Sequence, residues 1–389
     1  MSEIKVNSIK GVGASAAAIT VNNTDGTCTA NITNRTNKNV IQNGAFLISQ
    51  RGTSSTTNGF GSVDRFAVYS GGADETPTHA QVDVAAGTTP YTLGFRKALK
   101  ITNGNQTSGA GADDYIQART VLEAQDIANS GWNYLSTSSS ITISFWVKSS
   151  VAQNFYGNLW TQDGTEYNYI FETGSLSADT WTKVTKTIIG NSNLTFNNDN
   201  GAGLRIQLVA FMGTNKTGSV SLNTWAAFSG STITPDMTST WYTTNDATFE
   251  LTGVQLEVGS VATDFEHRSY GQELALCQRY CQRIRFGTYR GFNFIGRKTG
   301  SDTVVASMAG FPAMRASATS TVTDLAGFRL DRLTDGSTNT PTSLAFTHEN
   351  YEPYTVLKVT AGTSSYSTGD LCAMTNTNTA GDATLDAEL

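Results

Sequence analysis

The stretch SITISFWVK at residues 140–148 carries the pattern that decides the fold. Every second residue is apolar, and the apolar set is Ile141, Ile143, Phe145 and Val147. Successive side chains of a β-strand point to opposite faces, so this alternation predicts a strand with one buried face. The stretch therefore predicts a half-buried antiparallel strand.

The same alternation recurs in other stretches that are separated by clusters of Gly, Asn and Ser, namely 64–69, 95–102, 182–188, 204–211 and 248–258. In 204–211 the inward set is expected to be Leu204, Ile206, Leu208 and Ala210, with Arg205, Gln207 and Val209 pointing outward. Short strands at this spacing are typical of a β-sandwich. The long segment 213–244 has a turn-rich composition and is expected to be an exposed loop, although it carries aromatic residues.

One segment, YGQELALCQRYCQRI at 270–284, predicts an α-helix, because Leu274, Cys277, Cys281 and Ile284 fall on one helical stripe. Residues 1–38 are small and polar and cannot bury a core alone, so they must dock on another structure. The sequence thus predicts an all-β chain in four parts. They are an N-terminal anchor at 1–38, an antiparallel sandwich at 39–267, a connecting helix at 268–286, and a smaller β-sandwich domain at 287–389.

The composition excludes several classes of protein. Across 389 residues, 26 basic against 32 acidic side chains give a formal charge of −6, and no basic run suits nucleic acid as the main partner. Four irregularly spaced cysteines do not form a disulfide framework. We expect no membrane insertion and no ordinary signal peptide, because no apolar run is long enough.

Candidates for catalysis are weak. The chain has three histidines and no G-x-S-x-G elbow, so a nucleophilic triad is not expected. Sugar hydrolysis would use two carboxylates, and the nominal pairs are Asp74/Glu75, Asp113/Asp114 and Asp163/Glu166, all in turn-like sequence. Cys277 and Cys281 could share a face with His267, but further metal ligands are missing and buried thiols are the expectation. We expect no cofactor and no metal site, and leave open whether calcium is bound.

The tryptophans suggest binding. Trp146 and Trp181 are expected to pack on strands, whereas Trp160, Trp225 and Trp241 lie in or near loops, where aromatic faces can stack on sugar rings. The candidate glycan-binding residues are Trp160, Trp225, Trp241 and Tyr242. Packing in the core is the alternative for each. If these residues bind a glycan, replacing Trp225 and Trp241 with Ala weakens attachment without loss of folding.

Several blocks resemble a known family. VIQNGAFLISQRG at 40–52, ITISFWVKSS at 141–150, WTKVTKTI at 181–188 and the long block 249–284 are similar to the jelly-roll, carbohydrate-binding-module-like domain of bacteriophage tail fibres and other virion fibres. FPAMR at 311–315 and the terminal DAEL resemble the small β domain that follows the helix in that family. Asp264 and Cys281 stand where the family more often has Pro and Tyr.

The resemblance implies a structural, non-enzymatic tail fibre protein that is usually trimeric, resides in the virion after synthesis in the host cytoplasm, and contacts the host surface. Residues 1–38 are then expected to attach it to a tail adaptor or tail tube, and its partner at the other end is a surface glycan. In a homotrimer, the stripe Leu274, Cys277, Cys281 and Ile284 would pack around the threefold axis. The alternatives are a polysaccharide depolymerase that uses one of the acid pairs, and a fibre that decorates the capsid surface.

Overall fold

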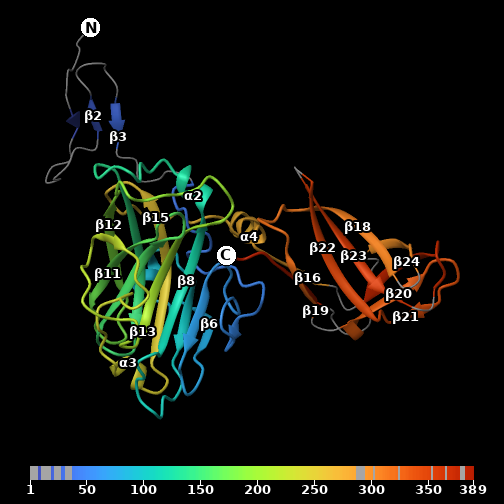
Figure 1. The fold of residues 1–389 in the computed structure, drawn as a ribbon, viewed down its shortest axis with the longest axis horizontal. Helices are drawn as coiled ribbons and strands as arrows, with labels where there is room; N and C mark the ends of the chain where they lie inside the picture. Colours follow the sequence, from blue (N-terminus) through green and yellow to red (C-terminus); the bar gives the residue numbers. More distant parts are fainter. Residues whose placement is uncertain are drawn as a thin grey trace, which may run out of the picture.

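A computed structural model describes residues 8–9, 19–21, 28–30, 37–285, 294–300, 303–322, 325–351, 354–363, 366–376 and 382–389. From residue 37 onward the described chain forms a large and a small β body with a short helix between them (Figure 1). Strands β1 (Ser8–Ile9), β2 (Ile19–Val21) and β3 (Cys28–Ala30) of the predicted anchor pair as an antiparallel sheet. Most of the predicted anchor lies outside the described residues.

The large body is a sandwich of two six-stranded antiparallel sheets. The first, here called the β13 sheet, has the order β14 (Trp225–Ala227), β11 (Tyr167–Ser175), β10 (Asn154–Thr161), β13 (Ala202–Met212), β8 (Tyr115–Glu123), β5 (Ala67–Gly71). The second, the β9 sheet, has the order β12 (Thr182–Ile189), β9 (Ser140–Ser149), β15 (Thr248–Val258), β7 (Lys97–Thr102), β6 (Thr78–Asp83), β4 (Ser54–Ser55). The chain crosses repeatedly from one sheet to the other, as in a jelly roll.

The predicted alternation is confirmed where it was clearest. Ile141, Ile143, Phe145 and Val147 of β9 are fully buried in the core between the sheets. The inward residues predicted for 204–211 also lie in this core. Loops of the sandwich contain the short helices α1 (Thr89–Thr92), α2 (Ala124–Ala128) and α3 (Thr240–Thr243). The fold class is therefore an all-β jelly-roll sandwich, followed by a second β unit.

The small body contains two further antiparallel sheets. One has the order β16 (Cys281–Arg285), β25 (Asp382–Asp386), β19 (Thr319–Val322). The other has the order β21 (Thr338–Asn339), β20 (Phe328–Arg332), β24 (Leu371–Asn376), β17 (Phe294–Lys298), β18 (Thr303–Phe311), β23 (Tyr354–Gly362), β22 (Ser343–Tyr351), with the 3-10 turn η1 (Leu325–Gly327) before β20. Phe328, Leu330 and Leu385 are fully buried in its separate core.

The connecting helix is shorter than the sequence predicts. Helix α4 (Tyr270–Gln278) begins at a capping box in which the Ser269 hydroxyl accepts from the Gln272 amide. Residues 281–285, predicted as its last turn, instead form β16 and pair with β25 about a hundred residues later. A local helical pattern carries no information about a partner strand so distant in sequence. The prediction of a helix through Ile284 is therefore wrong.

The predicted helical stripe consequently does not exist as one face. Cys281 and Ile284 lie on β16, and Ile284 packs against the small core. Cys277 and Cys281 are both 0% exposed within a single chain, so neither can contact another copy. Burial, the largest influence on each, raises the pKa of both thiols, as expected for inert core cysteines. The homotrimer itself stays a prediction.

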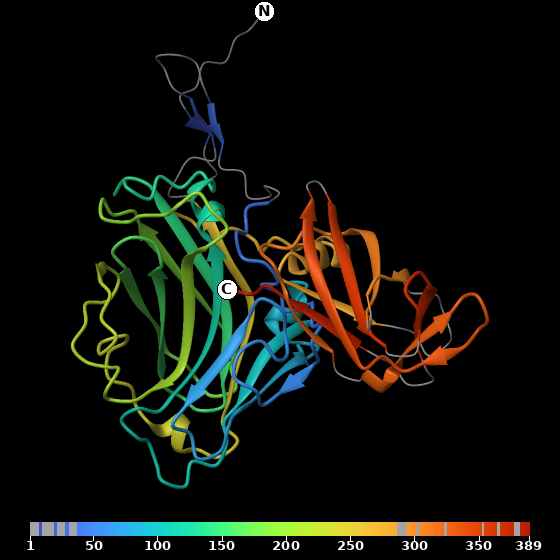
Figure 2. The same cartoon turned by 45° about the vertical axis from the view of Figure 1, so that its right-hand side comes forward.

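Buried charges connect the two bodies. Arg65, fully buried in the sandwich, pairs with Glu388, which follows β25, and its guanidinium lies 3.4 Å from the centre of the Tyr280 ring. Arg51 reaches Asp386 at 2.8 Å and Glu388 at 3.2 Å. The end of the chain lies at the side of the sandwich that faces the small body in Figure 1, and it lies over the sandwich in Figure 2. The small body is therefore bonded to the sandwich mainly by Arg51, Arg65 and Glu388, whose side chains solvent barely reaches.

Glu123 also lies at this junction, and the stability that its carboxylate provides depends on pH. Its carboxylate accepts from Arg279 at 2.6 and 2.7 Å and from the Tyr280 hydroxyl at 2.6 Å. Burial raises the pKa of Glu123, but these hydrogen bonds outweigh it and hold the pKa below its ordinary 4.5. A lowered carboxyl pKa stabilises the fold above 4.5, and this stabilisation is lost as pH falls through the folded-state value.

We expect Glu123→Gln to flatten the dependence of unfolding free energy on pH below 4.5, measured by urea unfolding at a series of pH values. Asp83→Asn is the control, because Asp83 is exposed where it pairs with Lys97. An unchanged slope in Glu123→Gln would contradict this role.

Candidate functional site

Three of the four predicted glycan-binding residues lie inside the sandwich. Trp241 on α3 is 0% exposed, and its indole Nε1 donates to the Thr248 carbonyl at 3.0 Å. Tyr242 is equally buried and stacks on Phe211. Trp225 on β14 is buried and donates to the Ile189 carbonyl. These three predictions are wrong, because the turn-rich segment 213–244 folds inward as β14 and α3.

Trp160, the fourth candidate, lies on the outer face of the β13 sheet. Its indole stacks on Phe228 with ring centres 3.7 Å apart and planes 9° from parallel. The guanidinium of Arg205, directly across from Trp160 on β13, lies 4.3 Å from the ring centre. Arg205 and Phe228 come from opposite sides of β10, so the indole stands between them. Trp160 thus supports an arginine and does not present an open ring face to a sugar.

The same outer face collects polar side chains that lack partners. We call Gln117, Arg119, Asn158, Trp160, Asn168, Arg205 and Gln207 the polar face; each alternates along its strand with residues of the core. Of sixteen buried side-chain N and O atoms without a hydrogen-bond partner in the described chain, eight belong to these seven residues. Asn158 is 0% exposed, and both of its amide atoms are among them.

Such atoms are uncommon in native proteins. A buried polar group without a partner costs about 1–3 kcal/mol, and buried groups are therefore nearly always hydrogen-bonded. A concentration of unpartnered groups on one sheet face, backed by aromatic rings, is typical of a surface that binds a polar molecule. The polar face is consequently the candidate binding site.

Two arginines stand out on the polar face. The guanidinium of Arg119 lies 3.8 Å from the centre of the Tyr69 ring, as that of Arg205 lies on Trp160. Neither has a carboxylate within 4 Å in the described chain. Burial, and then the charge of Arg119, lower the pKa of Arg205 to about 10. The two positively charged guanidinium groups therefore lie side by side, each against an aromatic ring.

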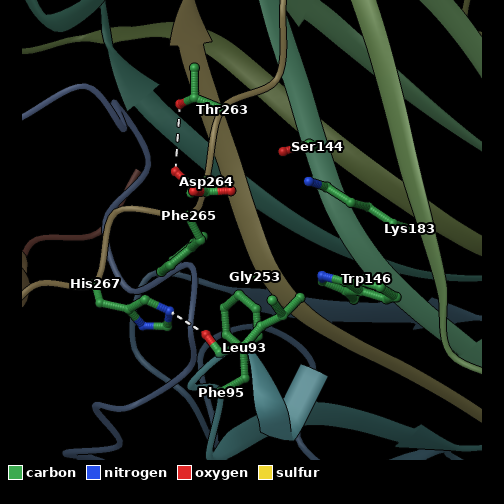
Figure 3. A pocket seen from close by; sticks show the side chains of 10 residues that line it. All are labelled: Leu93, Phe95, Ser144, Trp146, Lys183, Gly253, Thr263, Asp264, Phe265 and His267. Atoms are coloured by element: carbon green, nitrogen blue, oxygen red, sulfur yellow. Dashed lines mark hydrogen bonds between the residues drawn. The ribbon is translucent and has the colours of Figure 1, made fainter. Parts of the chain in front are cut away.

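A pocket on the opposite sheet is the competing site (Figure 3). It has a volume of about 260 Å³ and is lined partly by Trp146, Phe265, His267 and Lys183. His267 Nε2 bonds the Leu93 carbonyl at 2.9 Å, and the rings of Phe95, Phe265 and His267 pack edge to face or tilted. None of the unpartnered buried atoms belongs to its lining. The pocket is a depression beside the small hydrophobic cluster that contains Phe95.

The acid pairs have structural partners. Asp163 accepts from the backbone and side-chain amides of Asn197, and Asp114 accepts from the Gly111 amide. Asp74 accepts from Ser108, and Glu75 accepts from the Asn105 amide. These contacts are those of turn acids that fix neighbouring loops.

Among the described residues, no three His, Cys, Asp or Glu side chains form a group that could hold a metal ion. Within the same residues no helix is long and apolar enough to cross a membrane.

Sequence reasoning missed Gln117, Arg119, Asn158 and Asn168. The stretch YIQARTVLE, now β8, alternates Gln117 and Arg119 with apolar or small residues, and its neighbour β13 alternates Arg205 and Gln207. Outward positions on an exposed sheet usually mix Lys, Glu and Thr. Repeated Gln and Arg on two outward strands were a signal that could have located the face.

No family model and no curated protein matches this chain. Among solved structures, an enzymatically active domain of a bacteriophage CBA120 tailspike aligns with 57% of this chain and 21% of its own length, at 8% identity and a TM-score of 0.29. A CBM4 structure aligns with 56% of this chain and 99% of its own length, at 14% identity and a TM-score of 0.30. A tandem CBM22 from Paenibacillus barcinonensis aligns with 91% and 99%, at 10% identity and a TM-score of 0.27.

Proposed function

We propose that this protein binds a glycan without catalysis, on the polar face of its jelly roll. The observation that carries the proposal is that half of the unpartnered buried polar atoms found among the described residues lie on that face. Amides and guanidinium groups are suitable partners for sugar hydroxyls, because they offer donors and acceptors in fixed directions. A ligand there would satisfy groups that the chain leaves unpaired.

The wider role is proposed from the sequence resemblance of 40–52 and 249–284. We place the protein in a virion as a trimeric tail fibre whose residues 1–38 attach to a tail adaptor or tail tube. The glycan is then a component of the host surface. A fibre on the capsid surface would use the same binding face.

Imaging of intact particles labelled on the small body tests this placement. Label on the tail supports a tail fibre, whereas label on the head supports capsid decoration. A stable monomer at micromolar concentration, measured by light scattering, would contradict the trimer.

Asn158→Leu is expected to stabilise the fold. The substitution replaces a fully buried amide that has no partner with an apolar side chain of similar shape. Removal of an unsatisfied buried group should raise the free energy of unfolding by about 1 kcal/mol. Arg119 is half-buried and can reach a ligand, so Arg119→Gln should instead weaken glycan binding about tenfold. Urea unfolding and a glycan array measure the two effects.

Asn103→Leu is the matched control. Asn103 is as buried as Asn158, but its amide donates to the Tyr242 carbonyl at 2.5 Å and to the Thr244 carbonyl at 3.2 Å. The same substitution should therefore destabilise the fold there. Lys183→Ala tests the pocket on the β9 sheet. If Lys183→Ala loses glycan binding and Arg119→Gln does not, the pocket is the site. Release of reducing ends from a bound polysaccharide would instead support a depolymerase.

A further inference from the structure

We propose that the glycan bound by the polar face carries an anionic group, a carboxylate or a phosphate, and that Arg119 and Arg205 hold it together. This inference rests on the proposed function and narrows the class of ligand.

The two arginines are neighbours on adjacent strands. In the antiparallel register of β13 and β8, Gln207 faces Arg119 and Arg205 faces Val121. Arg205 is thus the diagonal neighbour of Arg119 on the same outer face. Diagonal neighbours lie about 7–8 Å apart at the backbone, within reach of long side chains. Two guanidinium groups at this spacing can both donate to one anion.

Both guanidinium groups lack partners, which is unusual in this chain. Every other half-buried or buried arginine whose side chain the structure describes donates at least one hydrogen bond. These arginines are Arg51, Arg65, Arg268, Arg279, Arg283, Arg315, Arg329 and Arg332. Arg119 and Arg205 donate none within the described residues, and their Nε atoms are buried. Charges that leave solvent normally require compensation, so the missing partner is expected to come from the ligand.

The neighbouring charges do not supply that partner. Glu166, in the turn between β10 and β11, raises the pKa of Arg205, but it lies beyond ion-pair distance. Burial and the charge of Arg119 act more strongly in the opposite direction. Neither guanidinium group is therefore neutralised by an ion pair among the described residues.

The aromatic rings hold the arginines ready for a ligand. Tyr69 lies under Arg119, and Trp160, itself stacked on Phe228, lies beside Arg205. Guanidinium groups stacked on rings keep their donors directed outward while losing little further freedom on binding.

The test compares charged and uncharged forms of similar polymers. Polygalacturonate and methyl-esterified pectin differ in a carboxylate, and phosphomannan and mannan differ in a phosphate. Binding of the full chain is measured by affinity electrophoresis. We expect wild type to bind at least one charged polymer about tenfold to a hundredfold more tightly than its uncharged counterpart, the range expected for one charge-assisted hydrogen bond.

Arg119→Gln and Arg205→Gln should each remove this preference, and Arg205→Lys should restore part of it by keeping the charge without the planar fork. Lys183→Gln, which removes a positive charge from the β9 sheet, should leave it unchanged. Equal binding of charged and uncharged polymers would overturn the anionic ligand while leaving the proposed function intact. Failure to bind any glycan of the array would overturn both. Whether pectate or phosphomannan is preferred identifies the anion.

Discussion

Glu388→Ala is expected to lower the free energy of unfolding of the jelly roll by about 3–5 kcal/mol, although Glu388 lies outside the jelly roll. Its carboxylate is the partner of Arg65, and the side chains are 4% and 1% exposed. Within the described part of the chain, the guanidinium of Arg65 otherwise bonds only the Val121 carbonyl and lies on the Tyr280 ring. Removal of the carboxylate leaves a buried charge without compensation, which costs far more than loss of a surface ion pair.

Tryptophan fluorescence during urea unfolding measures this effect in the right domain, because all six tryptophans lie between residues 132 and 241. Asp386→Asn is the control. Its side chain is 40% exposed where it pairs with Arg51, so its loss should cost at most about 1 kcal/mol. Arg65→Met combined with Glu388→Leu should recover most of the stability, since apolar residues can replace a buried pair. Equal decreases in the free energy of unfolding for Glu388→Ala and Asp386→Asn would contradict the role of the buried pair.

Trp241→Ala is expected to destabilise the sandwich by about 3–5 kcal/mol, the usual cost of removing a large buried aromatic side chain. The indole is fully buried and lies edge-on to Phe155 and Phe249, with ring centres 6.5 Å away in both cases. Its Nε1 bond to the Thr248 carbonyl ties α3 to the start of β15. Removal leaves both a cavity and an unpaired carbonyl. Any loss of glycan binding in this variant would follow from unfolding.

Trp181→Ala is the control for Trp241→Ala. Trp181 is half-buried, packs against the small cluster that contains Phe95, and lies 5.2 Å from the Lys148 ammonium. We expect Trp181→Ala to lower the free energy of unfolding markedly less than Trp241→Ala does. Thermal unfolding followed by circular dichroism checks both variants. A folded Trp241→Ala protein of normal stability that no longer binds glycan would restore the sequence prediction that this residue contacts the ligand.

The sequence predicted the strands best where one face is buried. Strand β15 begins and ends at the residues expected from its pattern, because alternation is a local signal. The prediction from sequence failed where a strand distant in the chain decides the conformation. Residues 281–285 fit a helix by their spacing, but β25 supplies backbone hydrogen bonds that a helical turn would forgo. Trp241 was misplaced for a similar reason, since composition alone does not show that a loop returns to the core.

The binding face was only partly predictable. The outward orientation of Arg205 and Gln207 followed from periodicity. Their neighbours Arg119 and Asn158 lie on strands whose pairing with β13 no local pattern reveals. The absence of partners for these side chains is a property of the assembled sheet.

The pairing of Arg65 with Glu388 has a consequence for synthesis of the chain. The two residues are 323 positions apart. The sandwich is complete only once β15 ends at Val258, 130 positions before Glu388, and at ordinary translation rates the ribosome needs roughly 6–26 s to make those residues. A jelly roll that forms on the nascent chain therefore waits that long with an uncompensated guanidinium in its interior. We expect the early sandwich to be a target for chaperones, and the arrival of Glu388 to end their binding to it.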